Sequence, residues 1–150
     1  MSTIDEKDKQ ILAVLKDHAE FTTRQIAKKT LLPVTTIHHR LQKLRKEGII
    51  RRYTIEPDYA ALDRGLLVYV LISVNLKYLK SKHKSQYDIV ADLRKQYFVE
   101  RADVVSGGTD IVAVVRVRDV TEYDKALLTK IQMIDGIDRT QSLIVIHETA

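Results

Sequence analysis

The stretch TTIHHRLQKLRKEGIIRRY, residues Thr35–Tyr53, decides how the N-terminal part of this chain folds. At 100° per residue, Ile37, Leu41 and Leu44 fall within an arc of about 60°, which predicts one buried stripe on a helix. The helix is expected to begin near Pro33, because proline suits a first turn, and to stop at Gly48, which suits the left-handed position after a helix. Its opposite side is polar and is predicted to face outward.

That polar side carries side chains suited to DNA. Thr, His and Gln can hydrogen-bond base edges, whereas Lys and Arg suit phosphates. Two shorter helices are predicted before it. The first has Asp5 and Asp8 as a capping pair at its start and buries Ile11, Leu12 and Leu15, and the second starts at Thr22 with capping-box spacing. Three such helices are typical of a helix-turn-helix. The predicted DNA-binding residues are Thr35, Thr36, His38, His39, Gln42, Lys43, Lys46, Arg51 and Arg52.

Positive charge is concentrated in the same region. The 150 residues include 25 Lys and Arg against 20 Asp and Glu, and residues 28–52 alone hold eight basic side chains and one acid, Glu47. The ordinary explanation of a charge run is a solvated face, but this concentration favours a surface that meets phosphates. Cysteine is absent, which excludes disulfides and thiolate metal sites and agrees with a reducing cytoplasm.

Three residues of the third helix allow other interpretations. His38 and His39 could equally be surface residues without a function. A metal site is not predicted, because adjacent helical residues diverge by 100° and the remaining histidines are scattered. Arg40 falls close to the buried stripe, so we expect it to form an ion pair that fixes the helix.

The rest of the chain predicts a different domain. Leu66–Leu76 is apolar on both alternating faces, so we expect a strand covered on two sides. A basic loop, KYLKSKHKS, leads to a helix over Ser85–Tyr97. The further predicted elements are strands over Val99–Val105, Ile111–Val117 and Ser142–His147, a helix over Val120–Ile134, and a weak strand over Ile50–Ile55 ahead of Pro57. The order β-α-β-β-α-β is typical of a ferredoxin-like fold, in which helices cover one face of the sheet. Apolar residues on the face without helices predict a dimer.

The turn SGGTD joins the two middle strands and is a candidate ligand site. The amides of Gly107 and Gly108 can hold a carboxylate and Asp110 an ammonium group, which are the two groups of an α-amino acid. The alternative is a tight hairpin in which glycine provides positive φ and Asp110 caps the turn. The predicted effector-binding residues are Ser106, Gly107, Gly108, Thr109, Asp110, Thr140, Gln141 and Ser142.

The whole chain resembles the Lrp/AsnC (leucine-responsive, or feast/famine) family of transcription regulators. The resemblance rests on Asp5-x-x-Asp8-Lys-Gln-Ile-Leu, Gln25-Ile26-Ala27, Thr36-Ile37-x-x-Arg40-Leu41-x-x-Leu44, Glu47-Gly48-Ile49-Ile50-Arg51-x-Tyr53, the Gly107–Asp110 turn and Gly136-Ile137-x-Arg139-Thr140. It implies an α+β fold in which a winged-type helix-turn-helix is joined by a strand linker to an ACT-like effector domain. It also implies dimers that often assemble into octamers, and control by an amino acid or similar small molecule bound between subunits.

Two positions depart from the family pattern. Family members usually have an acidic residue and an aromatic where this chain has Gly108 and Thr109, which leaves the effector's identity open. Many members have serine before the recognition helix, where this chain has Pro33, and proline also starts helices well.

We therefore expect a helix-turn-helix domain over residues 1–52, a strand linker over 53–65 and a ferredoxin-like effector and oligomerisation domain over 66–150. The expected function is a cytoplasmic, sequence-specific transcription regulator that binds double-stranded DNA and has no membrane segment. No cofactor is expected apart from a possible amino-acid effector.

Two other functions compete with this one. The first is an architectural protein with little sequence preference. The second is an enzyme using Asp103 and Asp110 beside His147, which is disfavoured because no nucleophile–base spacing, phosphate loop or metal set accompanies them.

Overall fold

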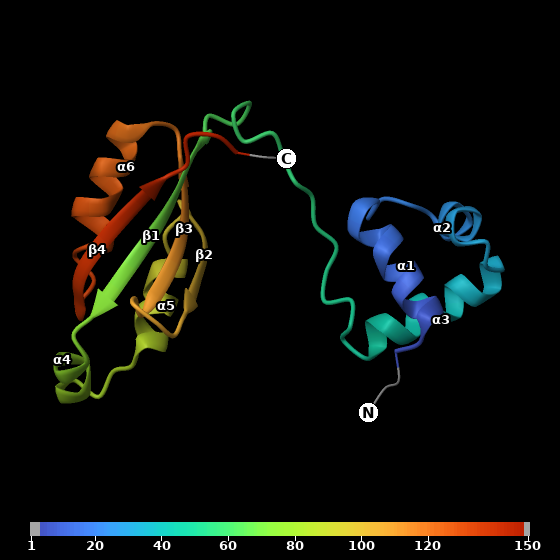
Figure 1. Ribbon diagram of the computed structural model, residues 1–150, viewed down its shortest axis with the longest axis horizontal. Helices are drawn as coiled ribbons and strands as arrows, with labels where there is room; N and C mark the ends of the chain where they lie inside the picture. Colours follow the sequence, from blue (N-terminus) through green and yellow to red (C-terminus); the bar gives the residue numbers. More distant parts are fainter. Residues whose placement is uncertain (1–3, 149–150) are drawn as a thin grey trace. The chain divides into compact units, whose positions relative to one another are not determined.

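The computed structural model describes residues 4–148, and the chain divides between Pro57 and Asp58 into two compact units (Figure 1). The division falls inside the predicted 53–65 linker. Residues 58–65 therefore belong with the second unit, whereas residues 53–57 belong with the first. Within the described chain, no helix is long and apolar enough to cross a membrane.

The first unit contains the three predicted helices, α1 (Glu6–Asp17), α2 (Thr23–Thr30) and α3 (Val34–Lys46). The predicted caps are confirmed: Asp5 with Asp8, and Thr22 with Gln25, each form a reciprocal capping box that satisfies amides at a helix start. The core joins all three helices through Ile11, Leu15, Ile26, Ala27, Ile37, Leu41 and Leu44. The predicted stripe of α3 is thus its buried side.

Gly48 ends α3 as predicted. Its φ of +70° is the left-handed conformation, and the Gly48 and Ile49 amides donate to the carbonyls of Arg45 and Leu44. The strand predicted over Ile50–Ile55 is wrong, since residues 51–58 form neither helix nor strand. A strand needs a backbone partner, and the described part of the chain provides none for this segment.

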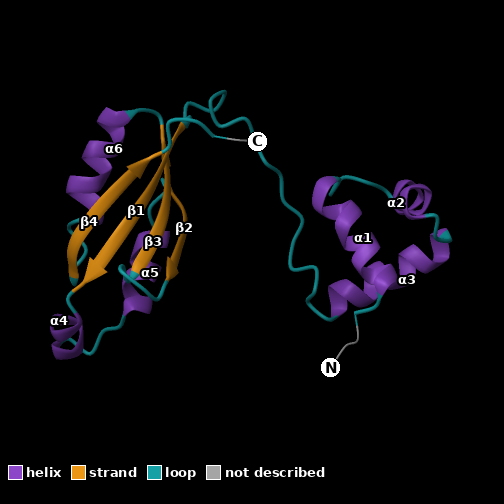
Figure 2. Ribbon diagram, viewed as in Figure 1, coloured by secondary structure: helices purple, strands orange, loops and turns teal. Residues whose placement is uncertain are grey.

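The second unit has the predicted ferredoxin-like order, with one four-stranded antiparallel sheet arranged β2-β3-β1-β4 (Figure 2). The strands are β1 (Leu66–Val74), β2 (Val99–Val104), β3 (Ile111–Val117) and β4 (Ile137–Ile144). The helices are α4 (Leu76–Ser81), α5 (Gln86–Arg94) and α6 (Val120–Ala126), which continues as the π-helical segment η1 (Leu127–Ile131).

Two predictions about these elements are wrong. The basic loop contains the helix α4, because Asn75 caps it by accepting a hydrogen bond from the Tyr78 amide at 2.9 Å. The last strand begins at Ile137, not Ser142, because its first residues pair with the end of β1. Gly136 makes this entry possible: its φ is +98°, and a Cβ there would overlap Leu79 of α4.

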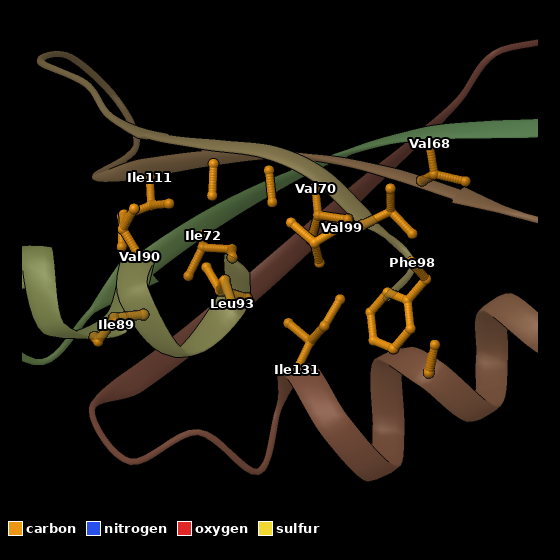
Figure 3. Close-up of a cluster of buried hydrophobic side chains, with 14 of the residues drawn as sticks. Val68, Val70, Ile72, Ile89, Val90, Leu93, Phe98, Val99, Ile111 and Ile131 are labelled. Carbon is orange, nitrogen blue, oxygen red and sulfur yellow. The ribbon is translucent and has the colours of Figure 1, made fainter. Parts of the chain in front are cut away.

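The helices α5 and α6 cover one face of the sheet (Figure 3). Ile89, Val90 and Leu93 of α5 and Ile131 of η1 pack against the alternate residues Val68, Val70 and Ile72 of β1, together with Ile111 and Val115 of β3. These side chains are almost fully buried. Burial of each such aliphatic side chain contributes about 1.5–3 kcal/mol, so this layer holds the unit together.

The other face, here called the open face, has no helix over it in this chain. Its apolar centre consists of Leu67, Tyr69, Leu71, Val112, Val114 and Leu143. Tyr69 is 40% exposed and Leu143 45% exposed. Within one chain, Leu67 at one end of this face is buried with 7% exposed, whereas its centre around Tyr69 is not covered. Cover of that centre by another subunit remains a prediction.

Arg116, which is buried at one end of the open face, fastens the start of the second unit to the sheet. Its guanidinium donates to Glu148 at 2.7 and 3.0 Å and stacks on the Tyr59 ring, 3.8 Å from the ring centre. The hydrogen bonds from Arg116 hold the pKa of Glu148 below its ordinary value. Arg64 adds hydrogen bonds to the Tyr97 and Arg116 carbonyls. Tyr59 and Arg64, at the end of the predicted linker, are thus held against the sheet of the second unit.

Candidate DNA-binding and effector sites

The outer side of α3 presents the predicted polar residues to solvent. Thr35, His38, His39, Gln42 and Lys46 are exposed, opposite the buried stripe. Thr36 and Lys43 flank them and are half-buried. The structure therefore places the predicted base-reading side chains on one accessible helix face.

A buried ion-pair network fixes α3 from behind. Arg40 donates to Asp5 at 2.6 Å and to Asp8 at 2.8 Å, and the Asp8 carboxylate is fully buried. Burial opposes ionisation of Asp8, but hydrogen bonds from Arg40 and the Asp5 amide outweigh it, so its pKa lies below the ordinary value. The expected ion pair of Arg40 is confirmed. It ties the start of α1 to the middle of the helix that carries the polar face.

Two of the predicted DNA-binding residues also make bonds within the unit. The Lys43 ammonium group lies 3.4 Å from Asp8, so Lys43 supports the ion-pair network as well as flanking the polar face. The Gln42 amide and the His38 ring nitrogen lie 3.0 Å apart, one helical turn from each other. This hydrogen bond orients both side chains, while the His39 side chain stays exposed at the centre of the face.

Two exposed apolar residues beside the polar face, Val34 and Leu31, were not among the predicted DNA-binding residues. Val34, the first residue of α3, is 43% exposed, and Leu31 in the preceding turn is 89% exposed with a φ of +58°. Recognition helices reach base edges with their N-terminal residues, and apolar side chains there contact thymine methyl groups. The signal was available in the sequence as the apolar run Leu31–Val34 directly before the polar face.

The basic flank continues beyond α3. Lys46, Arg51 and Arg52, which were predicted to contact phosphates, are exposed. Arg45, which the prediction omitted, donates to the Tyr53 hydroxyl at 3.0 Å and lies over its ring at 5.3 Å. This contact holds the segment after α3 against the end of the helix. Arg51 and Arg52 lie in that segment, where they line a hollow with Leu12 and Leu15 of α1.

The Ser106–Asp110 turn uses its polar groups on its own sheet. Asp110 accepts hydrogen bonds from the Val74 amide at 2.9 Å and from the Gln86 side chain at 3.0 Å. The Thr109 hydroxyl donates to the Ile72 carbonyl at 2.9 Å. Gly107 has a φ of +143°, which favours glycine. This geometry supports the hairpin alternative for Asp110, because both carboxylate oxygens already have donors.

A hollow of about 320 Å³ lies on the open face beside this turn. Gly108, Thr109 and Gln141 were predicted and line it, whereas Ser106, Gly107 and Asp110 do not. Its other lining residues, Leu71, Ser73 and Arg139, were not predicted to bind the effector. Arg139 supplies a cation for a carboxylate, Ser73 a hydroxyl and Leu71 an apolar wall.

Strand alternation separates the three predicted residues of β4. Thr140 and Ser142 pair with helix-facing positions of β1, whereas Gln141 pairs with Leu71 on the open face. The Ser142 and Tyr123 hydroxyls lie 2.5 Å apart, and the Gln132 amide donates to Thr140 at 2.9 Å. Thr140 and Ser142 are therefore on the opposite side of the sheet from the hollow.

The two carboxylates considered for an enzyme, Asp103 and Asp110, each bond to other side chains or to the backbone. Asp103 lies 2.5 Å from Arg101 and 3.7 Å from Arg94, whereas Asp110 is bound as described above. Over residues 4–148, no group of three or more His, Cys, Asp or Glu side chains is placed to hold a metal ion.

Each of the two units matches a known protein-domain family. Residues 4–51 match the winged helix-turn-helix DNA-binding model, and residues 68–150 match the Lrp/AsnC ligand-binding domain. An uncharacterized HTH-type transcriptional regulator of Pyrococcus furiosus is 31% identical over 141 residues, which cover 94% of this chain and 91% of that protein.

Solved structures agree with this result. Escherichia coli AsnC is 26% identical with a TM-score of 0.82, covering 99% of this chain and 96% of its own. A Neisseria meningitidis transcriptional regulator in complex with L-Met has the same fold, with 24% identity and a TM-score of 0.88, covering 99% and 93%.

Proposed function

This chain belongs to the Lrp/AsnC family of DNA-binding transcription regulators, and we propose that two separate surfaces of it bind DNA and a small-molecule effector. The outer face of α3 reads a specific DNA sequence, and the hollow on the open face binds an amino acid or similar small molecule. Binding in the hollow changes assembly or operator affinity. The observation that carries the proposal is the exposed polar face of α3, held from behind by the buried Arg40–Asp8 pair.

The side chains of α3 have separate roles in this proposal. His39, Gln42 and Thr35 hydrogen-bond base edges, and Val34 contacts a thymine methyl group. Lys46, Arg51 and Arg52 neutralise phosphates and set affinity for all sequences alike. Each of these charges therefore contributes to the salt dependence of binding, whereas the uncharged residues set the sequence preference.

The hollow suits an α-amino acid by its chemistry. The Arg139 guanidinium pairs with the carboxylate, Ser73 and Gln141 accept from the ammonium group, and Leu71 meets the side chain. The regulator from Neisseria meningitidis, which has the same fold, was solved as a complex with L-Met, and this supports the ligand class.

Assembly completes the proposal. The apolar centre of the open face is covered by the same face of a second copy, which makes a homodimer and leaves octamers as a further step. The protein works in the cytoplasm, without enzymatic activity and without a cofactor other than its effector.

Competition binding tests sequence specificity. The site selected from random DNA is expected to bind about 10³ times more tightly than random duplex at raised salt with competitor DNA. A ratio near one would favour the architectural alternative.

A further inference from the structure

Charge in the second unit is segregated into one short segment. Residues 58–150 hold thirteen basic and thirteen acidic side chains, so the unit is neutral by formal count. Four of the basic side chains lie within residues 77–84 (KYLKSKHK), which contain no acid. That segment carries +4, and the remaining residues of the unit carry −4. The four lysines Lys77, Lys80, Lys82 and Lys84 are here called the lysine patch.

The patch stands on a fixed scaffold. The Asn75 cap starts α4, and Leu79 anchors it in the core with 1% of its surface exposed. The backbone amides of Lys82 and Lys84 donate to the Leu79 carbonyl at 3.1 and 2.9 Å, which closes the turn after the helix. All four lysine side chains are exposed. In Figure 1, α4 lies at the end of the sheet where β1 leads towards α5.

The patch ammonium groups have no ion-pair partner among the described carboxylates. Lys82 lies 5.9 Å from the centre of the Tyr78 ring, and Lys84 acts only at longer range on Asp88, whose pKa is lowered first by hydrogen bonds from Ser85. Elsewhere in the unit, Lys95 pairs with Asp92 at 2.7 Å. The helix dipole explains a cation in the last turn of α4, but not Lys77 in its first turn. Four clustered, unpaired like charges favour an external polyanion.

We propose that the lysine patch binds the phosphate backbone of duplex DNA outside the footprint of the helix-turn-helix. The six residues of α4 span about 9 Å, a length over which a duplex presents about five phosphates. The one Phe, Tyr or Trp of the segment, Tyr78, is partly buried, which disfavours the stacking of unpaired bases and hence single strands. This inference rests on operator binding by the first unit, which holds flanking DNA at high local concentration near the patch.

Duplex length isolates the contribution of the patch. One duplex is trimmed to the two half-sites and the other extends several helical turns beyond them on both sides. Wild type is expected to bind the long duplex more tightly, and Lys77→Gln/Lys80→Gln to lose that advantage. Each phosphate that the variant no longer neutralises lowers the salt slope by about 0.9, which is up to about eightfold in affinity at 0.1 M salt. Binding to the short duplex is expected to stay unchanged.

The matched control is Lys125→Gln/Lys130→Gln, which removes two exposed lysines from α6 and η1 of the same unit. It is expected to behave as wild type on both duplexes. The proposal is overturned if wild type binds both duplexes equally, or if the patch and control variants lose the same affinity. An equal loss on both duplexes also overturns it, because the lysines would then act within the footprint or through assembly, which sedimentation measures. Failure of wild type to prefer the operator over random duplex would instead count against the proposed function.

Discussion

The outer face of α3 and the Ser106–Asp110 turn both carry side chains of the right chemistry for a ligand, yet they differ in where those side chains bond. Behind α3, Arg40 and Asp8 do the anchoring, so His39 and its neighbours face solvent. In the turn, Thr109 and Asp110 bond to the backbone of their own sheet. A side chain remains available to a ligand when other residues make the bonds that fix its helix or turn. In the second unit Thr109 and Asp110 are themselves the anchors, so we propose that their neighbours Arg139 and Ser73 bind the ligand.

The largest effect is expected at the anchor of α3. Arg40→Gln removes the main partner of the buried Asp8 carboxylate, and we expect the unfolding free energy of the first unit to fall by about 3 kcal/mol. The matched control Arg51→Gln, at an exposed position, is expected to change it by no more than about 0.5 kcal/mol. Urea unfolding measures both. Equal stability of the two variants would show that the ion pair does not hold α3.

The same ion pair predicts acid sensitivity of the first unit. Hydrogen bonds from the Asp8 amide and Arg40 lower the pKa of Asp5, and the pKa of Asp8 is also lowered. This stabilisation is complete above the ordinary value of 3.8 and is lost as the pH falls from there through the lowered values. Arg40→Gln should flatten the dependence, which pH-resolved unfolding measures.

In the second unit, two variants separate residues that anchor the turn from residues that are proposed to contact the ligand. Asp110→Ala leaves the Val74 amide without its acceptor and is expected to cost about 2 kcal/mol of unfolding free energy. Arg139→Gln, at an exposed position, should change stability by no more than about 0.5 kcal/mol but abolish the effector response, whose coupling is expected at about 1–3 kcal/mol. Calorimetry over the common amino acids, with unfolding in parallel, measures both. If Arg139→Gln responded as wild type does, the hollow would not be the effector site.

A smaller effect is expected at the start of α3. Replacing a contacted thymine by uracil removes one methyl group, and wild type should then bind about fourfold more weakly, as expected for about 0.8 kcal/mol. Val34→Ser should bind the two operators equally, because serine has no apolar side chain to pack against the methyl group. A thymine outside the footprint serves as the control substitution. Equal sensitivity of wild type and Val34→Ser to uracil would remove Val34 from the base-reading set.

The smallest effect concerns His38 and His39. An imidazole can donate to or accept from a base edge, so we expect both side chains to contribute to sequence preference. His39→Ala should alter the preferred base at one position of each half-site, whereas His38→Ala, which breaks the bond to Gln42, should alter it less. Selection of bound fragments from random DNA measures the preference, and an unchanged preference in the double variant would make both histidines ordinary surface residues.

Local and periodic features of the fold could be predicted from the sequence. The caps at Asp5 and Thr22, the stripe of α3 and the order of strands and helices along the chain follow from short-range patterns that the final packing keeps. The strand at Ile50–Ile55 could not, because alternation does not supply a hydrogen-bonding partner. The helix α4 was hidden by its lysines, although the Asn75 cap marked its start.

Which residues line the hollow was harder to predict, because the face on which a β residue lies depends on register. Thr140, Gln141 and Ser142 are similar in chemistry, but pairing with β1 places only Gln141 on the open face. Arg139 reaches the hollow for the same reason. On α3 the helical period alone determines the exposed side, so the corresponding prediction could be made from the sequence.

In the proposed function, the outer face of α3 determines the DNA sequence that is bound, and its basic flank determines the affinity. Selection of bound fragments from random DNA, carried out with wild type, His39→Ala and Lys46→Ala, tests this claim most directly. Wild type should enrich a pseudo-palindrome whose half-sites lie about 10 bp or a multiple apart. His39→Ala should change the preferred base at symmetric positions, and Lys46→Ala should keep the motif with a lower salt slope. The same motif from wild type and His39→Ala, with a changed motif from Lys46→Ala, would contradict the account.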